Sequence, residues 1–394
     1  MDETIWVTIT LLILFALVIR GVDFGYAIIF STTLFLLIVS PNSLLSTLLG
    51  ALTNSKTIEL AIAISLINIL GFMMKETKQF DEIVNSFRSF LKTSQIIVII
   101  PALFGLLPIP GGALMSATLL EEFRERVKVR VEILTITNIW YRRVIGFVYP
   151  LMPSIIFLSK LTEINIYHII IYQIPTFLFA TIIGHFLVKF DKNDSEEFRK
   201  KESIMKVLKN VMPLILPVAL SILGVPLFIA IFIGITTCLL QHNKPTFRDI
   251  LIFLKRGFDI SMCLAIIGIM YFIEALEISD VVNSVYPMIE SKFQPTIVIT
   301  LPFIIALLVG SMLASVSISV LLLSPFLHTP HQISLLYVAS ICGSVVSPLN
   351  LSNIVTLKCF KVQYKRFLPK MLLIATLALL FHSLYLLILF FPNF

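Results

Sequence analysis

Long apolar segments follow one another along almost the whole chain, separated by short polar loops. The apolar runs cover residues 5–19, 24–40, 57–75, 94–121, 133–159, 164–189, 209–223, 225–241, 259–276, 294–327, 332–357 and 369–391. A helix of about 20 apolar residues is long enough to cross a bilayer. Because helices satisfy their own backbone polar groups in lipid, this pattern predicts an all-α polytopic membrane protein.

Two of these runs, 94–121 and 294–327, are unusually long and are interrupted near their middle. The sequence PIPGG at 108–112 breaks the first run, and Gly310-Ser311 breaks the second. The arms on either side of each break are too short to cross the bilayer. Each run is therefore either a re-entrant hairpin or one spanning helix kinked at the break. Irregular backbone inside a membrane is tolerated only beside protein or a water-filled cavity.

The distribution of basic residues favours the hairpins. If both runs return to the side from which they enter, every lysine and arginine except Lys56, Lys160 and Lys292 lies on the side of Arg20. Basic loops mark the cytoplasmic side. The pattern therefore predicts about ten spanning helices, two re-entrant hairpins and both termini outside. The net charge of +7 is then a topology signal and gives no reason to expect nucleic-acid binding.

The chain also contains an internal repeat. Four segments match in order at offsets of 198 to 201 residues: INILGF at 67–72 with IGIMYF at 267–272, VNS at 84–86 with VNS at 282–284, the runs ending at Pro101 and Pro302, and PLMPSII at 150–156 with PLNLSNI at 348–354. The linker before the first hairpin is basic and that before the second is acidic, as inverted-topology halves require. Inverted repeats are common in secondary transporters. We predict repeats over 1–190 and 209–394, joined by a cytoplasmic linker over 191–208.

Candidate binding residues lie at the two hairpin tips and in two helices broken at proline, over about 133–159 and 332–357. Broken helices expose amides that attract anions and carbonyls that coordinate cations. Hydroxyl and amide side chains complete such a site at a lower cost than a buried charge, although small residues also simply let helices pack closely. The predicted substrate and ion site comprises Pro108, Pro110, Gly111, Gly112, Ser116, Asn138, Arg143, Tyr149, Pro150, Ser154, Gly310, Ser311, Ser315, Ser347, Pro348, Asn350, Ser352, Asn353 and Thr356.

Few charged or titratable side chains lie inside the apolar runs. Arg143 lies seven residues before Pro150, roughly 10 Å of helix rise, so it could reach a carboxylate in a cavity open to the cytoplasm. The alternative is that Arg142 and Arg143 both simply mark the cytoplasmic boundary of the membrane. Glu274, His185 and His382 are candidate proton carriers, or else satisfied or interfacial side chains. We expect no cofactor, and H⁺ or a Na⁺ near the hairpin tips as the coupling ion.

Three motifs resemble those of a known family. They are PIPGGALMSA at 108–117, NIWYRR at 138–143 with YPLMPSIIF at 149–157, and SPLNLSNIVTL at 347–357. The chain is similar over essentially its whole length to an uncharacterised prokaryotic membrane protein family, a domain-of-unknown-function family of the ion transporter superfamily. That superfamily includes gluconate-type permeases and dicarboxylate and citrate carriers. The chain departs from the pattern at Arg143, where a histidine is common, and in a second hairpin without a clear Ser-Asn-Thr signature.

The resemblance implies inverted repeats, two hairpins, a homodimer and elevator-like transport of an organic anion with H⁺ or Na⁺. We therefore predict a secondary transporter of a small carboxylate in the inner (cytoplasmic) membrane. An ion channel or a lipid-handling protein is the alternative. A membrane-embedded protease is disfavoured, because EEFRER at 121–126 fits EExxxR while no histidine stands in the FxxxH or HxxxN/D context. We expect no enzymatic activity.

Overall fold

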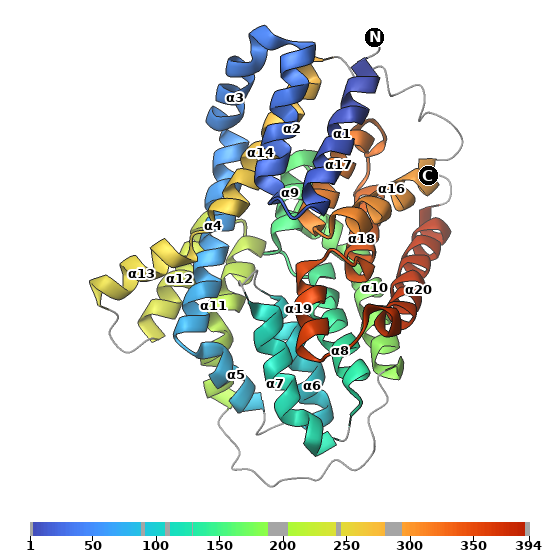
Figure 1. Ribbon diagram of the computed structural model, residues 1–394. Helices are drawn as coiled ribbons and strands as arrows, with labels where there is room; N and C mark the ends of the chain where they lie inside the picture. Colours follow the sequence, from blue (N-terminus) through green and yellow to red (C-terminus); the bar gives the residue numbers. More distant parts are fainter. Residues whose placement is uncertain are drawn as a thin grey trace.

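The computed structural model describes residues 3–87, 91–106, 111–127, 129–187, 204–241, 246–279 and 294–390, and these fold into helices without a strand (Figure 1). By length and composition, five segments of the described chain can cross a membrane: Ser55–Glu76, Ile166–Phe186, Ile260–Ile278, Pro330–Cys359 and Tyr364–Leu389. Shorter apolar helices accompany them. The chain is an all-α multi-pass membrane protein, as the apolar pattern predicts. The finer count of about ten spans stays a prediction.

The described helices are divided between the two halves of the chain. The first half forms α1 (Glu3–Ile19), α2 (Phe24–Val39), η1 (Pro41–Ser43), α3 (Leu44–Thr53), α4 (Ser55–Glu76), α5 (Gln79–Phe87), α6 (Thr93–Gly105), α7 (Gly112–Val127), α8 (Val131–Val144), η2 (Ile145–Phe147), α9 (Pro153–Thr162) and α10 (Ile166–Leu187). The second half forms α11 (Ile204–Ile222), α12 (Leu227–Gln241), α13 (Phe247–Gly257), α14 (Ile260–Ile278), α16 (Gln294–Val309), α17 (Met312–Leu323), η3 (Ser324–Phe326), α18 (Pro330–Val346), α19 (Leu351–Cys359) and α20 (Tyr364–Phe390).

Each of the two long interrupted runs is a pair of helices that pack against one another. The first pair is α6 and α7, and the second is α16 and α17. At the second tip Gly310 has φ +70°, a left-handed conformation that glycine adopts without strain, and the Ser311 side chain caps α17 by accepting from the Ala314 amide. At the first tip Gly111 is described, whereas residues 107–110, with Pro108 and Pro110, lie outside the described residues. Re-entry of these hairpins into the membrane stays a prediction.

Both predicted broken helices are interrupted at their prolines. In the first, α8 ends at Val144 and α9 begins at Pro153, a residue suited to the first helical turn because it needs no hydrogen-bond acceptor there. In the second, α18 ends at Val346 and α19 begins at Leu351, with Asn350 as its N-cap. Each break therefore places one helix N-terminus inside the protein.

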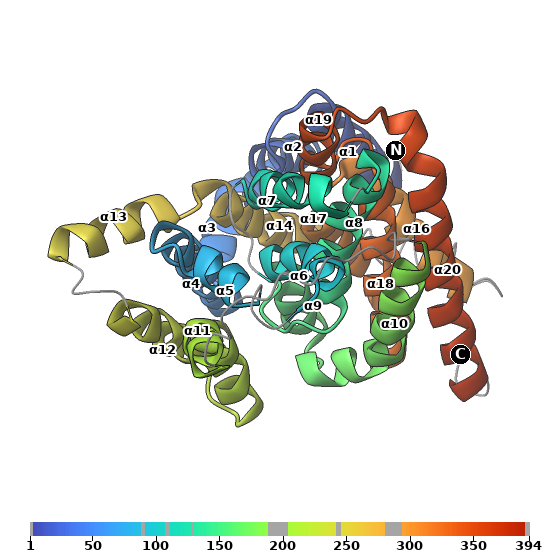
Figure 2. The ribbon, with the colours of Figure 1, turned by 90° about the horizontal axis from the view of Figure 1, so that it is seen from below.

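The helices form two groups (Figures 1 and 2). We call α1–α5 and α11–α14 the scaffold group, in which α2 packs on α14 and α4 on α12 and α13. We call α6–α10 and α16–α20 the hairpin group, in which α6 packs on α8 and α16 on α18. The groups meet where α4 contacts α9, α14 contacts α17, α1 contacts α16 and α5 contacts α6.

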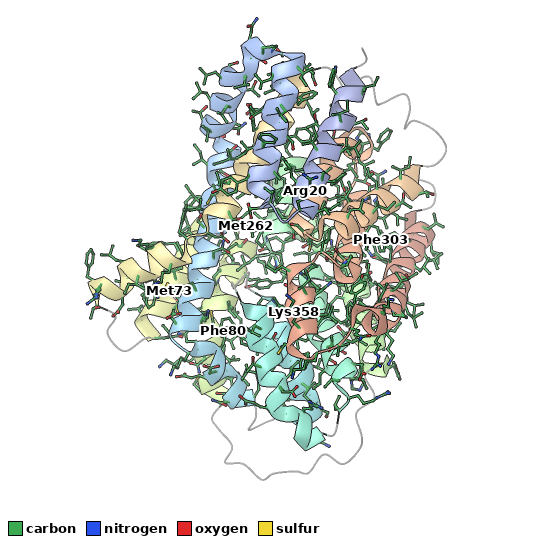
Figure 3. The ribbon with its side chains drawn as sticks, in the orientation of Figure 1. Arg20, Met73, Phe80, Met262, Phe303 and Lys358 are labelled. Carbon is green, nitrogen blue, oxygen red and sulfur yellow. The ribbon has the colours of Figure 1, made fainter. Side chains whose placement is uncertain are left out.

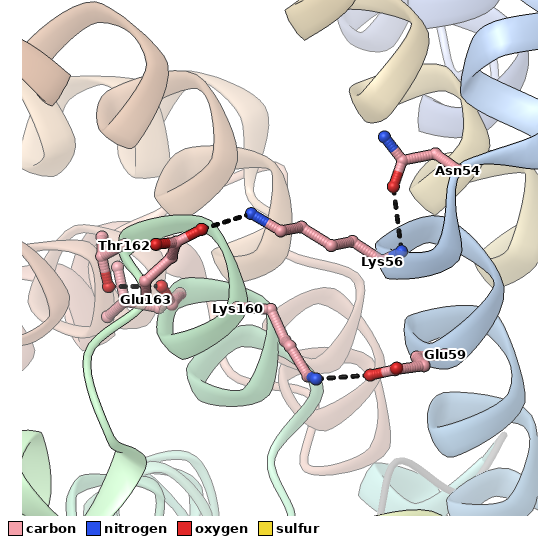
Figure 4. Close-up of polar contacts among 7 residues, drawn as sticks. Asn54, Lys56, Glu59, Lys160, Thr162 and Glu163 are labelled. Carbon is pink, nitrogen blue, oxygen red and sulfur yellow. Dashed lines mark hydrogen bonds and ion pairs between the residues drawn. The ribbon is translucent and has the colours of Figure 1, made fainter.

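Two ion pairs join the groups between the start of α4 and the end of α9 (Figure 4). Lys56 and Glu163 are 2.6 Å apart, and Lys160 and Glu59 are 2.5 Å apart. The hydrogen bond and charge of Lys56 lower the pKa of Glu163. The basic-residue pattern places both Lys56 and Lys160 on the outer side, and their proximity is consistent with that topology.

Three short helices occupy segments that the apolar pattern leaves as loops. These are α3, α5 and α13. The apolar side chains of α5, Phe80, Ile83 and Val84, are buried against the protein. The linker expected over 191–208 is shorter than predicted, because α11 begins at Ile204, and residues 191–203 lie outside the described residues.

Candidate functional site

A cavity of about 460 Å³ lies between the scaffold group and the hairpin group. The scaffold group contributes Asp23, Phe24 and Gly25 at the start of α2, and Ser261, Met262 and Ala265 at the start of α14. The hairpin group contributes Phe104, Gly105, Arg142, Arg143, Met152, Pro153, Ser154, Gly310, Ser311, Met312, Leu313, Asn350, Leu351 and Ser352. Met262 marks the scaffold wall in Figure 3. The volume is within the range of small-molecule sites, about 300–1,000 Å³.

Three helices of the hairpin group begin at this cavity. The first residues of α9, α17 and α19, which are Pro153, Met312 and Leu351, all line it. The free amides of a helix N-terminus carry a partial positive charge and bind anions. The local sequence explains each start, since Pro153 suits a first turn and Ser311 and Asn350 are capping residues. The interrupted segments therefore direct positive helix ends at one space.

Two adjacent arginines of α8 add full positive charges to the same wall. Nη2 of Arg143 donates to Oδ1 of Asn350 at 3.3 Å, whereas Nε of Arg142 is buried without a hydrogen-bond partner. Within the described part of the chain, neither guanidinium has a carboxylate within 4.0 Å. A buried charge is costly unless it is paired. A bound anion would therefore act as the counter-ion that these two cations lack.

Asn350 holds the second break against the tip of the second hairpin. Its side-chain oxygen accepts from the amides of Ser352 and Asn353, at 3.0 and 3.3 Å, and its Nδ2 donates to the Gly310 carbonyl at 2.8 Å. The Ser347 hydroxyl donates to the Leu307 carbonyl at 2.7 Å. The positions of Arg143, the α19 N-terminus and the hairpin tip are thus fixed by one side chain.

A second buried network ties the first hairpin to the second broken helix, behind the cavity wall. The Ser116 hydroxyl donates to Oδ1 of Asn138 at 2.7 Å, and Nδ2 of Asn138 donates to the Thr356 hydroxyl at 3.1 Å and the Ala113 carbonyl at 3.3 Å. All three side chains are fully buried. Neither half of the chain could build this network alone.

The Asn353 amide satisfies the carbonyl groups that the second break frees. Its Nδ2 donates to the carbonyls of Val345 and Ser347, at 2.8 and 3.0 Å. Its Oδ1 is buried without a hydrogen-bond partner. Carbonyls at a helix break can coordinate a cation. Here the Asn353 side chain donates hydrogen bonds to these carbonyls instead, which is a structural role.

Sequence comparison assigns the chain to a family. The family model described as "Protein of unknown function (DUF401)" matches residues 4–389. The chain belongs to this family. The prediction of a domain-of-unknown-function membrane protein family is thereby confirmed, and its place in the ion transporter superfamily stays a prediction.

Among solved structures, the chain is similar to the YdaH transporter of Alcanivorax borkumensis, which is described as having an unusual topology. The two chains are 13% identical, with a TM-score of 0.60 over 90% of this chain and 89% of the other. At this identity the likeness shows the fold. A comparison with curated proteins gave no match.

The structure brings about a third of the predicted site residues to the cavity. Arg143, Ser154, Gly310, Ser311, Asn350 and Ser352 line it. Six others lie in the buried networks around it: Ser116, Asn138, Ser315, Ser347, Asn353 and Thr356. Of these, Ser315 donates to the Pro302 carbonyl inside the second hairpin pair, a packing role.

Five other predicted residues that the structure describes do not line the cavity. Tyr149 and Pro150 are buried, and the Tyr149 hydroxyl has no hydrogen-bond partner. Pro348 is exposed, Gly111 is at the first tip with open space around it, and Gly112 starts α7. Pro108 and Pro110 lie outside the described residues.

Sequence reasoning missed the scaffold wall of the cavity and Arg142. Asp23 caps α2, accepting from the Gly25 amide at 3.0 Å, and its other oxygen accepts from the Ser261 hydroxyl at 2.5 Å. An aspartate before an apolar run is a capping signal, but nothing in it indicates a neighbour 238 residues away. Arg142 had one available signal, its position beside Arg143.

None of the three candidate proton carriers lines the cavity. His382 is fully buried between α10, α18 and α20, with Nδ1 at 2.6 Å from the Thr176 hydroxyl and Nε2 at 3.2 Å from that of Ser334. Glu274 lies beside α3, 3.5 Å from Nδ2 of Asn54. His185 is exposed near the end of α10. A proton role for any of them stays a prediction.

Substitutions of Asn350 and Ser352 should separate binding from stability. Ser352→Ala removes a hydroxyl from the cavity wall and should weaken transport with a stability change within about 0.5 kcal/mol. Asn350→Ala should weaken transport and also lower stability by about 1 kcal/mol or more, because it removes a helix cap. Counter-flow in proteoliposomes and thermal melts measure both, with Ser383→Ala on α20 as the control. Unchanged kinetics in both variants would place the site elsewhere.

Proposed function

We propose that the protein is a secondary active transporter of a small organic anion, a carboxylate. The observation that carries this proposal is the pair Arg142 and Arg143, which face a cavity together with three helix N-termini and without a carboxylate partner among the described residues. A guanidinium binds a carboxylate through two parallel hydrogen bonds. Two such groups side by side favour a ligand with two acidic groups over one with a single acidic group.

We further propose that residues 1–190 and 209–394 are inverted repeats that alternate access by an elevator motion. The helices α6, α7, α8 and α9 begin at 93, 112, 131 and 153, and α16 to α19 follow the same order from 294, 312, 330 and 351. Contacts repeat as well, since α7 packs on α19 and α17 on α9. Inverted repeats with discontinuous helices are typical of secondary transporters. The likeness of the fold to YdaH, described as a transporter, supports this class.

The moving part in this proposal is the hairpin group. It holds both arginines and the three helix ends, while the scaffold group contributes the opposite wall of the cavity. H⁺ or Na⁺ is the proposed coupling ion, and the protein is proposed to be an inner-membrane homodimer with both termini outside. Proximity of Lys56 to Glu163 and of Lys160 to Glu59 supports placing the start of α4 and the end of α9 on the same side of the membrane, which the basic-residue pattern assigns to the outside.

Counter-flow in proteoliposomes tests the proposed function directly. A panel of mono-, di- and tricarboxylates is assayed with and without Na⁺ and with and without a pH gradient, and thermal shifts report binding. We expect saturable exchange, with dicarboxylates favoured over monocarboxylates of the same size. Conductance without saturation or exchange would indicate a channel. No exchange or thermal shift with any of the acids, together with a response to cations or lipids, would overturn the proposal.

The ion pairs between α4 and α9 should affect rate more than stability. Exposed ion pairs contribute little to stability, and all four side chains are about half exposed or more. Glu59→Gln with Glu163→Gln should therefore leave the melting temperature nearly unchanged and speed exchange, because the groups separate more easily. A carboxylate whose pKa is lowered in the folded protein contributes stability that is lost as the pH falls through that pKa. Protonation of Glu163 at low pH should therefore weaken its ion pair with Lys56 and, like the two substitutions, speed exchange.

The matched control is Glu121→Gln. It breaks the ion pair between Glu121 and Arg124, which lies within α7 and does not connect the scaffold group to the hairpin group. Equal rates in the double variant and the wild type would show that these pairs do not restrain the motion.

A further inference from the structure

The helix α13 has an apolar face that no other part of the described chain covers. Phe247, Leu251 and Leu254 are spaced four and three residues apart and lie along one face, and the C-cap residue Phe258 follows four residues after Leu254. Their exposed fractions are 76%, 50%, 45% and 46%. In both ribbon views α13 lies at the periphery, beyond α4 (Figures 1 and 2).

A different face of α13 attaches it to the protein. Phe253 and Gly257 are buried, and a Cβ on Gly257 would come within 2.8 Å of the Ile69 backbone in α4. By contrast, α5, the other strongly amphipathic short helix, buries its apolar residues Phe80 and Ile83. The exposed apolar face of α13 is thus a second face, additional to the one used for packing.

Basic side chains flank the exposed apolar face. Arg248 and Lys255 lie seven residues apart, two helical turns, and therefore on one side of the helix; Arg256 follows them, and all three are exposed. The acidic residue of α13, Asp249, is engaged in a capping box with Thr246. At 11 residues α13 is roughly 16 Å long, about half the thickness of the hydrocarbon core.

We propose that α13 lies in the plane of the membrane interface and binds anionic phospholipid, with its apolar face in the acyl region and its basic flank on the headgroups. A short helix with an apolar face, a basic polar face and too little length to span binds in this way. Each basic residue near an anionic surface contributes about 1 kcal/mol. The basic-residue pattern also assigns α13 to the cytoplasmic side, where bilayers are anionic.

Quenching of a tryptophan by brominated lipid tests this proposal in the full-length protein. Phe247→Trp reports on the apolar face, with the parent protein subtracted to remove the signals of Trp6 and Trp140. The protein is reconstituted in two mixtures of the same composition. In one, phosphatidylglycerol is brominated and phosphatidylcholine is not; in the other, phosphatidylcholine is brominated and phosphatidylglycerol is not. We expect the brominated anionic lipid, at equal mole fraction, to quench the new tryptophan about twofold more.

Three variants make the result specific. Arg248→Gln with Lys255→Gln and Arg256→Gln should remove the preference and leave quenching by total lipid unchanged. The same three-charge change at Lys361, Lys365 and Lys370, exposed cations away from α13, should leave the preference intact. Ile388→Trp, on an exposed apolar stretch of α20 without charges, should show no preference.

Equal quenching by both lipids at position 247 would overturn the anionic-lipid proposal. No quenching by either would show that a second copy or another partner covers the face. Neither result depends on the transported substrate.

Discussion

Replacing Arg143 with glutamine should weaken substrate binding by roughly 30-fold to 1,000-fold, equivalent to about 2–4 kcal/mol. Arg143 lines the cavity, and within the described residues its side chain hydrogen-bonds to the neutral amide oxygen of Asn350 and to no carboxylate. A bound carboxylate would thus be its strongest partner, and the neutral amide of glutamine cannot replace that charge. Isothermal titration and counter-flow with the best acid of the panel measure the loss.

The stability of the empty protein distinguishes a binding role from a structural one. Because an unpaired, partly buried charge is costly, Arg143→Gln should leave the melting temperature of the ligand-free protein unchanged or raise it. Arg143→Lys keeps the charge but loses the two-pronged geometry, so it should bind with intermediate affinity. Arg124→Gln, an exposed arginine paired with Glu121 on α7, is the control. A fall in melting temperature with unchanged affinity would make Arg143 a structural residue.

Replacing Gly310 with alanine should abolish transport and destabilise the hairpin group. Gly310 has φ +70°, and an added Cβ would lie 2.6 Å from the Asn350 amide nitrogen and 2.6 Å from the Leu349 carbonyl carbon. The left-handed conformation alone costs alanine about 1–2 kcal/mol. The clash adds to this cost, because only a shift of the hairpin tip relieves it, and that shift breaks the hydrogen bond from Asn350.

The first hairpin provides a matched comparison. Gly111 has φ +78° at the corresponding tip, but nothing lies within 4 Å of an added Cβ. Gly111→Ala should therefore show the conformational cost alone, about 1–2 kcal/mol, with transport largely kept. Thermal melts and counter-flow rates of the two variants, measured together, test this difference. Equal losses in both would mean that contact between the second tip and the break is unimportant.

The arrangement of the cavity explains why paired interruptions occur in this chain. A continuous helix offers its backbone amides to itself, whereas each break frees an N-terminus. The structure aims those of α9, α17 and α19 at the same space as Arg142 and Arg143. An anion can then be bound by backbone groups and by two cations that are not paired with a carboxylate in the described part of the chain; Asp23, the acidic residue in the lining, instead caps α2 and accepts from Ser261.

The sequence by itself determined the helical membrane class and the position of each interruption. These properties are local: apolar length decides whether a segment suits lipid, and proline, glycine and capping residues decide where helices start and stop. Thus α19 begins just after Asn350 and the second hairpin turns at Gly310, as the sequence predicts. Arg143, Asn350 and Ser352 could be selected because they stand beside such breaks.

Only the tertiary structure decided which residues share the cavity. Asp23 and Ser261 meet across 238 residues, and Asn138 bonds to Thr356 across 218. No local pattern encodes such pairings, because they depend on how the two halves pack. For the same reason Tyr149, only six residues from Arg143 along the chain, lies away from the cavity wall, whereas Arg142 is part of it. Sequence determines where a helix can break, and packing determines what that break faces.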